Sequence, residues 1–477
     1  MKLNTLLTDL NVQVFGATDI EITGIQFDSR KVETGNIFVA QVGTTMDGHT
    51  FVDGCIAQGA AAVVISNPAY KRDGVTTILA ENTDYVLGIM AHRWFGCPSE
   101  HLQLVGVTGT NGKTTIATLL YKMTRALGYK AGLLSTVVNY IDDQAVPSTH
   151  TTPDALELNG LLRQMVDAGC QYAFMEVSSH SIAQERIAGL QFQGAAFTNL
   201  TRDHLDYHKT FDNYRDTKKR LFDNLPKTAF AVTNKDDKNG LVMTQNTQAE
   251  VHTYSTRTLA DFKASILEEG FDGMLLNING QDIFVPLVGR FNASNILAIY
   301  GTAISLGLDK MDVLRVLSTL TAVNGRFETI HSPKGWTAIV DYAHTPDAVD
   351  NVIQTINEIR KGHLITVVGC GGNRDKGKRP IMAQIAKHGS DQLILTSDNP
   401  RDEEPADILQ DMAAGLTEDE LRQTLIIEDR ASAIQTACTL AQANDVILVA
   451  GKGHEDYQII KGVKHHFDDH EIVKKYC

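Results

Sequence analysis

The 477-residue chain contains 43% hydrophobic and 21% charged residues, which is typical of a folded globular enzyme and excludes a disordered chain. Its formal net charge of −14 argues against general binding to nucleic acid or to acidic membrane lipids, because both select basic surfaces. A chain of this length exceeds a single hydrophobic core, so we expect three domains with clefts between them.

Six cysteines are scattered along the chain without CxxC spacing. This pattern favours neither a disulfide framework nor a zinc ribbon, and it is typical of a reducing compartment. The first residues carry Lys2 and a short apolar stretch that Asp9 interrupts, which is too weak for a signal peptide. No segment approaches the ~20 apolar residues that a membrane span requires. We therefore expect a cytoplasmic protein without membrane insertion.

Residues 1–98 are predicted to form a small mixed α/β domain, with strand-like runs at 20–27, 36–42 and 60–65. The pattern breaks at residues 95–98, where glycine and proline follow each other closely, and a domain boundary is placed there.

Residues 99–323 are predicted to form a central domain built on a parallel sheet with helices on both faces. Apolar runs at 102–107, 172–177, 195–198 and 230–233 alternate with helix-like stretches in this region. The alternation restarts in residues 324–477, with apolar runs at 336–340, 364–368, 392–396, 424–427 and 446–450. This pattern predicts a second doubly wound, Rossmann-like domain.

A glycine-rich segment, Gly106 to Thr115, follows the first apolar run of the central domain and leads into a helix that ends near Gly128. Glycines allow backbone N–H groups to wrap a phosphate, and Lys113 and Thr114 stand where a lysine reaches the outer phosphates and a hydroxyl holds magnesium. The general pattern has glycine where Val107 stands, so we expect a variant of this loop. The alternative is a plain strand-to-helix turn.

Two further clusters follow strand ends. Glu176 ends the run at 172–177 and is a candidate magnesium ligand, although a solvated strand end is the simpler interpretation of one carboxylate. The segment Thr198 to His208 holds two histidines, two aspartates and an arginine. His204 and His208 have the i, i+4 spacing of zinc ligands on a helix, but no third ligand is in register.

The segment Asn234-Lys-Asp-Asp237 contains the Asn-Lys-x-Asp pattern with which regulatory GTPases recognise guanine. A GTPase is therefore the alternative from another functional class. The missing first glycine of the loop and the absence of an Asp-x-x-Gly motif after a strand argue against it.

Motifs along the whole chain together resemble the Mur ligases. They are, in order, Asp28 to Arg30, Gly109 to Thr115, Glu176 to His180, Asn199 to His208, Asp341 to Pro346, Gly369 to Pro380, Asp398 to Arg401 and Gly451 to Glu455. The resemblance implies a three-domain cytoplasmic enzyme of peptidoglycan synthesis, acting as a monomer, that adds the third peptide residue to UDP-MurNAc-L-Ala-D-Glu. ATP first phosphorylates the D-Glu side-chain carboxylate, and the amine of the incoming amino acid then displaces phosphate.

The resemblance also assigns site residues. ATP contacts are implied for Thr108, Gly109, Thr110, Asn111, Gly112, Lys113, Thr114, Asn295, Arg326 and Asp341, with Asn292 a weaker candidate. Two magnesium ions are implied, with Thr114, Glu176, His204 and a carbamylated Lys218 as ligands or near neighbours. Catalytic roles fall on Lys113, Lys218, Glu176 and His204. A core or capping role for Asn292 and Asn295, and a solvated helix face for Lys218, remain open from sequence.

The remaining assignments concern the two substrates. Contacts to the UDP-sugar peptide are implied for Ser29, Thr151, Thr152, Ser178, Gln184 and Arg186, and the role of His150 is open. Contacts to the amino acid are implied for Arg374, Asp398, Asn399, Pro400, Arg401, Gly451 and Glu455. Arg401 favours meso-diaminopimelate over L-lysine as the acceptor, because a guanidinium forms paired hydrogen bonds with the extra carboxylate. The alternatives are the lysine-adding version of the same ligase and a solvated loop position for Arg401.

Overall fold

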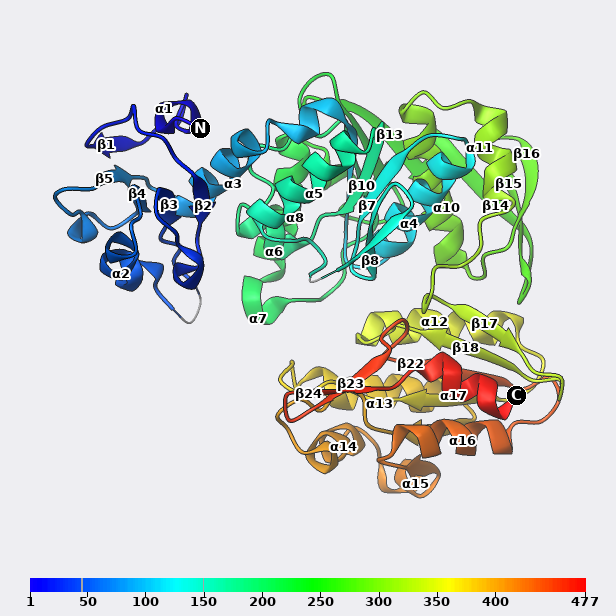
Figure 1. The fold of residues 1–477 in the computed structure, drawn as a ribbon. Helices are drawn as coiled ribbons and strands as arrows, with labels where there is room; N and C mark the ends of the chain where they lie inside the picture. The colour runs from blue at the N-terminus through cyan, green and yellow to red at the C-terminus, as the bar shows by residue number, and fades with distance from the viewer. Residues whose placement is uncertain (44–45, 149) are drawn as a thin grey trace.

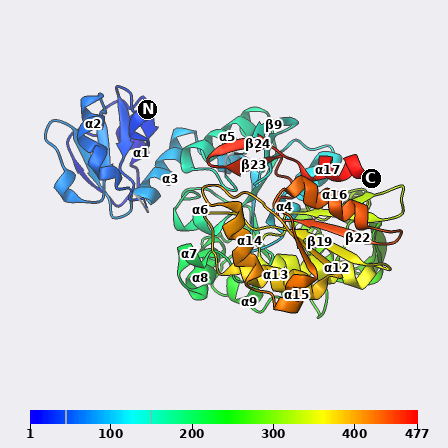
Figure 2. The same cartoon turned by 90° about the horizontal axis from the view of Figure 1, so that it is seen from below.

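The computed structural model describes residues 1–43, 46–148 and 150–477, which form three α/β domains in chain order (Figure 1). Viewed from below, the C-terminal domain overlies the central domain, and the N-terminal domain stands to one side (Figure 2). Among the described helices, none is long and apolar enough to cross a membrane.

The N-terminal domain is built on a five-stranded sheet of order β1-β5-β4-β3-β2, in which only β1 runs antiparallel to its neighbour. Its elements are α1 (Leu3–Leu6), β1 (Gln13–Phe15), β2 (Gly24–Gln26), η1 (Ser29–Lys31), β3 (Asn36–Val39), η2 (Gly48–Phe51), α2 (Val52–Ala57), β4 (Ala62–Ile65), η3 (Pro68–Tyr70), β5 (Thr76–Leu79) and α3 (Thr83–Trp94). The predicted runs at 20–27 and 36–42 are longer than the strands, because each ends in a loop.

Helix α3 links the first two domains. Its apolar residues Val86, Leu87 and Met90 lie in the N-terminal core, and the same cluster contains Ala155 of the central domain. The 3-10 helix η4 (Pro98–His101) then connects α3 to the first central strand.

The central domain contains an 11-stranded sheet of order β16-β15-β14-β13-β12-β11-β6-β10-β7-β8-β9. Its elements are β6 (Gln103–Thr108), α4 (Lys113–Ala126), β7 (Ala131–Leu134), β8 (Val138–Ile141), β9 (Gln144–Pro147), α5 (Ala155–Asp167), β10 (Tyr172–Glu176), α6 (Ser179–Ala183), β11 (Gly194–Phe197), α7 (Leu205–His208), α8 (Phe211–Asp223), β12 (Phe230–Asn234), α9 (Gly240–Met243), β13 (Glu250–Ser255), β14 (Phe262–Gly270), β15 (Gly273–Ile278), β16 (Gln281–Val285), α10 (Arg290–Ser305) and α11 (Lys310–Leu317). One core packs α4, α10 and α11 on one face, and a second packs α5 and α8 on the other.

The prediction of a parallel sheet holds for the middle of this sheet but is wrong at its edges. Strands β8 and β9 extend it antiparallel beyond β7, and β15 and β16 extend it antiparallel beyond β14. Tight turns rather than helices connect these strands, as at Asn279 and Gly280, which both have positive φ.

The C-terminal domain is a six-stranded sheet of order β17-β18-β22-β19-β20-β21, parallel except for β17. Its elements are β17 (Glu328–His331), β18 (Thr337–Asp341), α12 (Pro346–Ile359), β19 (Leu364–Val368), α13 (Lys378–Gly389), β20 (Gln392–Leu395), α14 (Pro405–Ala413), α15 (Glu418–Arg422), β21 (Thr424–Ile426), α16 (Arg430–Leu440), β22 (Val446–Ala450), the hairpin β23 (Tyr457–Ile460) and β24 (Val463–His466), and α17 (Asp469–Tyr476). Helices cover both faces of the sheet, which confirms the predicted doubly wound fold.

Candidate active site

The predicted phosphate loop joins β6 to α4. Gly112 precedes the helix with φ 89°, and Gly109 has φ 149°, where a Cβ atom would lie 1.9 Å from the Thr198 hydroxyl oxygen. Asn199 fixes the loop from outside, since its Oδ1 accepts the Asn111 N–H at 2.9 Å. The loop therefore has a fixed shape at the amino end of a buried helix, as anion binding requires.

Lys113 folds back over this loop. Its ammonium donates to the carbonyl oxygens of Gly109 at 3.0 Å and Thr110 at 2.8 Å. Burial lowers the pKa of Lys113, while the carboxylates of Glu176 and Asp203 oppose that shift. The lysine is thus held where the glycine-rich turn opens toward a ligand.

Glu176 meets Thr114 at the end of β10. The Thr114 hydroxyl donates to Glu176 Oε2 at 3.0 Å, and the Thr136 N–H donates to Oε1 at 2.8 Å. Glu176 is only 1% exposed. The structure therefore brings two predicted metal ligands, both with oxygen donors, into contact, and it adds the Thr136 backbone, which the sequence did not single out.

Lys218 points from α8 into the same region. It is 1% exposed, and its ammonium donates to the Gly109 carbonyl at 2.8 Å and lies 4.9 Å from the centre of the Tyr214 ring. Burial lowers the pKa of Lys218 well below its ordinary value, and Lys113 adds to this shift. Lys219 instead forms an ion pair with Asp223 one turn along the helix.

The histidines of the central domain form an aromatic cluster. The His204 ring lies 4.8 Å from that of His180, and His208 Nε2 lies 2.9 Å from the Ser179 hydroxyl. Burial lowers the pKa of both His204 and His208 to about 4. Among the described residues, His204 makes no hydrogen bond to Thr114 or Glu176. His204 and His208 also have no third zinc ligand within reach in the described part of the chain, so the zinc interpretation finds no support.

A cleft of about 910 Å³ opens in front of the phosphate loop, between the central and C-terminal domains. This volume suits a nucleotide-sized ligand. Of the predicted nucleotide residues it is lined by Asn111, Gly112, Thr114, Asn292, Asn295, Arg326 and Asp341. Thr108, Gly109, Thr110 and Lys113 belong to the loop itself.

Three predicted nucleotide residues outside the loop have different structural roles. Asn295 faces the loop, because a Cβ atom on Gly112 would lie 2.6 Å from its Oδ1. Asp341 accepts the Phe327 and Ala343 N–H groups at 2.6 and 2.7 Å and so fixes the turn that carries Arg326. The Arg326 guanidinium lies 4.4 Å from the centre of the Tyr342 ring, a contact that the sequence did not indicate.

The guanine-recognition interpretation of Asn234-Lys-Asp-Asp237 finds no support in the structure. Asp236 accepts the Thr256 N–H at 2.7 Å, and Asp237 accepts the Leu200 N–H at 2.8 Å. Asn234 donates to the Thr198 carbonyl at 2.7 Å. These side chains already serve to join neighbouring loops.

Five of the six residues predicted for the sugar peptide form one network. The Thr152 hydroxyl donates to the Glu176 carbonyl at 2.8 Å and accepts the Ser178 N–H at 3.2 Å. Arg186 donates to the Thr152 carbonyl at 2.7 Å and to Gln184 Oε1 at 2.6 Å, and Thr151 accepts from the Thr136 hydroxyl at 3.1 Å. Ser29 lies apart in η1 and makes no hydrogen bond to this network among the described residues.

The residues predicted for the amino acid gather at the carboxyl end of the C-terminal sheet, with opposite charges on two sides. On the acidic side, Asn399 donates to Glu455 Oε2 at 2.7 Å, and a Cβ atom on Gly451 would lie 2.6 Å from Asp398 Oδ2. Burial and the nearby Asp398 raise the pKa of Glu455. Pro400 connects this side to Arg401.

On the basic side, Arg401 donates to the Gly372 carbonyl at 2.8 Å and has φ 55°. A Cβ atom on Gly371 would lie 2.8 Å from Arg401 Nη1 and 3.9 Å from Arg374 Cγ, so both arginines border the same glycine. The acidic neighbour Glu403 pairs with Arg379 instead. Among the described residues, neither Arg374 nor Arg401 forms an ion pair.

Three family models match the chain. They are described as Mur ligase family, catalytic domain (residues 21–95), Mur ligase middle domain (107–303) and Mur ligase, glutamate ligase domain (325–453).

Two relatives that match over nearly the whole chain carry the same name. The UDP-N-acetylmuramoyl-L-alanyl-D-glutamate--2,6-diaminopimelate ligase of Phocaeicola vulgatus is 61% identical over 99% of both chains. The ligase of the same name from Bacteroides fragilis is 58% identical over 100% of this chain and 99% of its own. A solved structure of a ligase with this name matches with a TM-score of 0.71 and 33% identity, covering 100% of this chain and 98% of the other.

Proposed function

Because this chain belongs to the Mur ligase family, we propose that it joins 2,6-diaminopimelate to UDP-N-acetylmuramoyl-L-alanyl-D-glutamate at the expense of ATP, in peptidoglycan synthesis. The observation that carries this proposal is the cleft in which the phosphate loop of the central domain faces Arg326 of the C-terminal domain. Relatives that match over nearly the whole chain are named for these two substrates.

The reaction must bring a carboxylate to a triphosphate, and the like charges repel each other strongly at short range. We propose that the Lys113 ammonium leaves the Gly109 and Thr110 carbonyls to neutralise the transferred phosphoryl group. The D-Glu side-chain carboxylate attacks the γ-phosphorus and ADP leaves. The amine of diaminopimelate then attacks the acyl carbon, loses a proton, and displaces inorganic phosphate.

The oxygen donors of Thr114 and Glu176 fit Mg²⁺, since they lie 3.0 Å apart at the helix start and hard cations prefer oxygen. Magnesium held there would supply positive charge to the phosphates, and we propose two ions in all. Glu176 is oriented for this role by the Thr136 N–H.

We propose that Lys218 carries a carbamate. Its buried amine has a depressed pKa, which favours the neutral nucleophile. The neutral amine nitrogen bonds to the carbon of CO₂ and one N–H proton leaves, so that a carbamate anion, which suits magnesium, replaces the amine beside Lys113. The ion pair of Lys219 with Asp223 leaves that neighbour unsuited to the role.

The acceptor specificity is proposed to rest on the two sides of the C-terminal site. Asp398 and Glu455 suit an ammonium, whereas Arg374 and Arg401 suit a carboxylate. Diaminopimelate carries both groups at each end, while lysine lacks the second carboxylate. We therefore propose meso-diaminopimelate rather than L-lysine.

We propose that the enzyme works as a monomer. We also propose that it lies in the cytoplasm, since all six cysteines are free thiols, as is usual in a reducing compartment. One assay tests the function: phosphate release with ATP, UDP-MurNAc-L-Ala-D-Glu and each amino acid in turn. Release should require all three substrates and be fastest with diaminopimelate. Phosphate release with lysine but not with diaminopimelate would overturn the proposal. Hydrolysis of GTP in the absence of the sugar peptide and the amino acid would also overturn it.

A further inference from the structure

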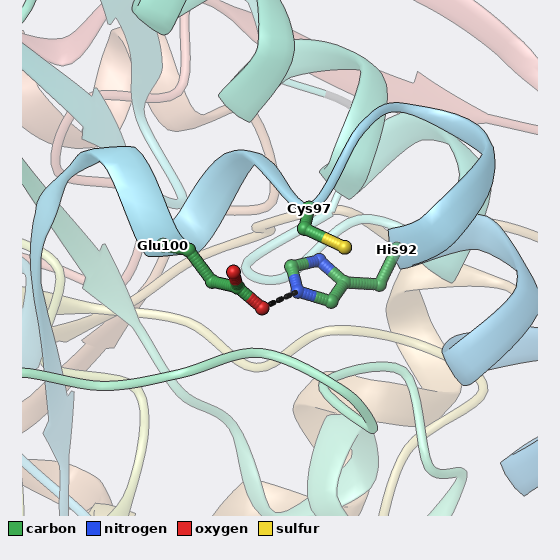
Figure 3. Close-up of side chains that lie close together, drawn as sticks. All are labelled: His92, Cys97 and Glu100. Atoms are coloured by element: carbon green, nitrogen blue, oxygen red, sulfur yellow. Dashed lines mark ion pairs between the residues drawn. The ribbon is translucent and has the colours of Figure 1, made fainter. Parts of the chain in front are cut away.

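A separate group of electron-pair donors lies at the junction of the N-terminal and central domains. His92 comes from the last turn of α3, Cys97 precedes η4, and Glu100 belongs to η4. One donor atom of each lies within 4.8 Å of the other two. Figure 3 shows the thiol and the carboxylate both turned toward the imidazole. Within residues 1–43, 46–148 and 150–477, no other group of three or more such side chains comes as close together.

The backbone directs Cys97 at the helix end. Gly96 and Cys97 both have positive φ, at 73° and 51°, and the Cys97 N–H donates to the His92 carbonyl at 2.8 Å. This turn reverses the chain, so that the sulfur faces the ring. Left-handed geometry at a cysteine is uncommon.

The hydrogen-bond network fixes the imidazole tautomer. Asn159 Nδ2 donates to the Ala155 carbonyl at 2.9 Å, so Asn159 Oδ1 must be the atom that faces His92 Nδ1, at 3.2 Å. Nδ1 therefore carries the proton, and Nε2 carries the lone pair. Burial lowers the pKa of His92, consistent with a neutral ring.

That lone pair points at other electron-rich atoms. Glu100 Oε1 lies 3.9 Å from His92 Nε2, which is too far for a hydrogen bond. The Ser99 hydroxyl accepts the Gln191 N–H at 2.9 Å and lies 3.4 Å from Nε2, to which it can donate a long hydrogen bond. Nitrogen, sulfur and carboxylate oxygen thus converge, and the long Ser99 contact is the weak interaction that a metal ion would replace.

We propose that this junction binds a zinc ion through His92 Nε2, the Cys97 thiolate and a Glu100 carboxylate oxygen, with water in the fourth position. A nitrogen and a sulfur ligand select Zn²⁺ over Mg²⁺ or Ca²⁺, which prefer oxygen. Binding displaces the thiol proton of Cys97 to solvent. Asn159 and Gln191 orient the ligands, the latter by donating from its side-chain amide to Glu100 Oε1 at 3.1 Å.

The site would stabilise the junction rather than take part in the chemistry. Asn159 on α5 contacts His92, and Gln191, which lies before β11, contacts Glu100. An ion that fixes His92 and Glu100 would therefore also hold α3 and η4 against the central domain. None of the three ligands belongs to the nucleotide cleft, the sugar-peptide network or the amino-acid site.

The test uses the full chain stripped with a chelator and titrated with Co²⁺, a spectroscopic substitute for Zn²⁺. We expect one ion per chain, with a thiolate-to-cobalt charge-transfer band. Cys97→Ser should abolish this band, and Glu100→Gln should weaken binding, because it removes the anionic oxygen ligand. Each new side chain is close in size to the one that it replaces, and Glu100 is exposed, so both variants should fold. Cys477→Ser, which changes the other half-buried thiol, is the matched control.

A second readout is thiol protection. Zn²⁺ should protect Cys97, and not Cys477, from alkylation and should raise the Tm of the wild type more than that of Cys97→Ser. The proposal is overturned by a wild type without a thiolate band, or by a band that survives Cys97→Ser. Because neither readout measures the ligase reaction, the result is independent of the proposed function.

Discussion

The Nη2 atom of Arg326, at the start of the C-terminal domain, donates a hydrogen bond to the Thr114 hydroxyl of the phosphate loop over 3.2 Å. That hydroxyl in turn donates to Glu176. A ligand that engages the loop is therefore coupled to the position of the C-terminal domain.

From this coupling we expect an ATP analogue and the UDP-sugar peptide together to draw the domains closer. Small-angle scattering should show a smaller radius of gyration with both ligands, and a weaker effect in Arg326→Gln. Arg315→Gln, an exposed arginine paired with Asp312 on α11, is the control. An unchanged radius for the wild type would contradict coupled closure.

Lys113→Ala should leave the protein folded but lower kcat by at least about a hundredfold, because the charge that stabilises the transferred phosphoryl group is lost. Steady-state phosphate release measures this, with circular dichroism as the check on folding. The control variant Lys130→Ala, which changes an exposed lysine, should behave like the wild type. Near-normal turnover by folded Lys113→Ala would remove the catalytic role of the lysine.

Lys218→Ala should be nearly inactive and should regain part of its activity with short carboxylic acids, which replace the carbamate oxygens. Lys219→Ala should stay active, since that side chain pairs with Asp223 rather than facing the phosphate loop. Activity measured with and without added acetate compares the two variants. Loss of activity in Lys219→Ala alone would place the carbamate one residue later.

Arg401→Ala should lower kcat/KM for diaminopimelate much more than for lysine, because the extra carboxylate loses its cationic partner. Competition kinetics with both amino acids measure the preference. Arg422→Ala, at an exposed position on α15, controls for charge. A wild type that prefers lysine, or unchanged diaminopimelate kinetics in Arg401→Ala, would refute the assignment.

Glu403 supports the loops that carry these arginines. The buried Arg379 and the Asn373 N–H lower the pKa of Glu403 from its ordinary 4.5 to about 2. A depressed pKa gives stability that is present above 4.5 and is lost as the pH falls toward 2. Glu403→Gln should therefore have a lower Tm at neutral pH, and the gap should narrow between pH 4.5 and 2. A gap independent of pH would contradict this linkage.

The strand that ends before Gly109 and the helix that begins at Lys113 could be predicted because apolar runs and glycines determine both locally. The alternation of strands and helices in the C-terminal domain could be predicted in the same way, whereas the place of β22 between β18 and β19 could not. The antiparallel edges do not follow from the alternation of apolar runs and helices, although Asn279-Gly280 is a recognisable hairpin turn. Buried polar contacts such as Thr136 with Glu176 depend on strand packing and leave no local pattern.

Among the site residues, short segments predicted proximity, whereas the roles of these residues stay predictions. Thr152, Ser178 and Arg186 were expected together and lie together. Asp341 was expected to touch ATP, and this stays a prediction; it lines the cleft, and its carboxylate accepts two backbone N–H groups. The separation of Lys218 from Lys219 required the helix orientation, because adjacent residues project about 100° apart.

The 11-stranded sheet ends in two strands of unequal character. At one edge β9 finishes at Pro147, which has no N–H to offer another strand. At the other edge β16 has only Asp282 as a charged residue, and Phe284 on that strand is 49% exposed. Unpaired strand edges are templates for aggregation, and charge and proline are the usual protection. In concentrated or partly unfolded protein, β16 is therefore the edge expected to recruit a second chain first.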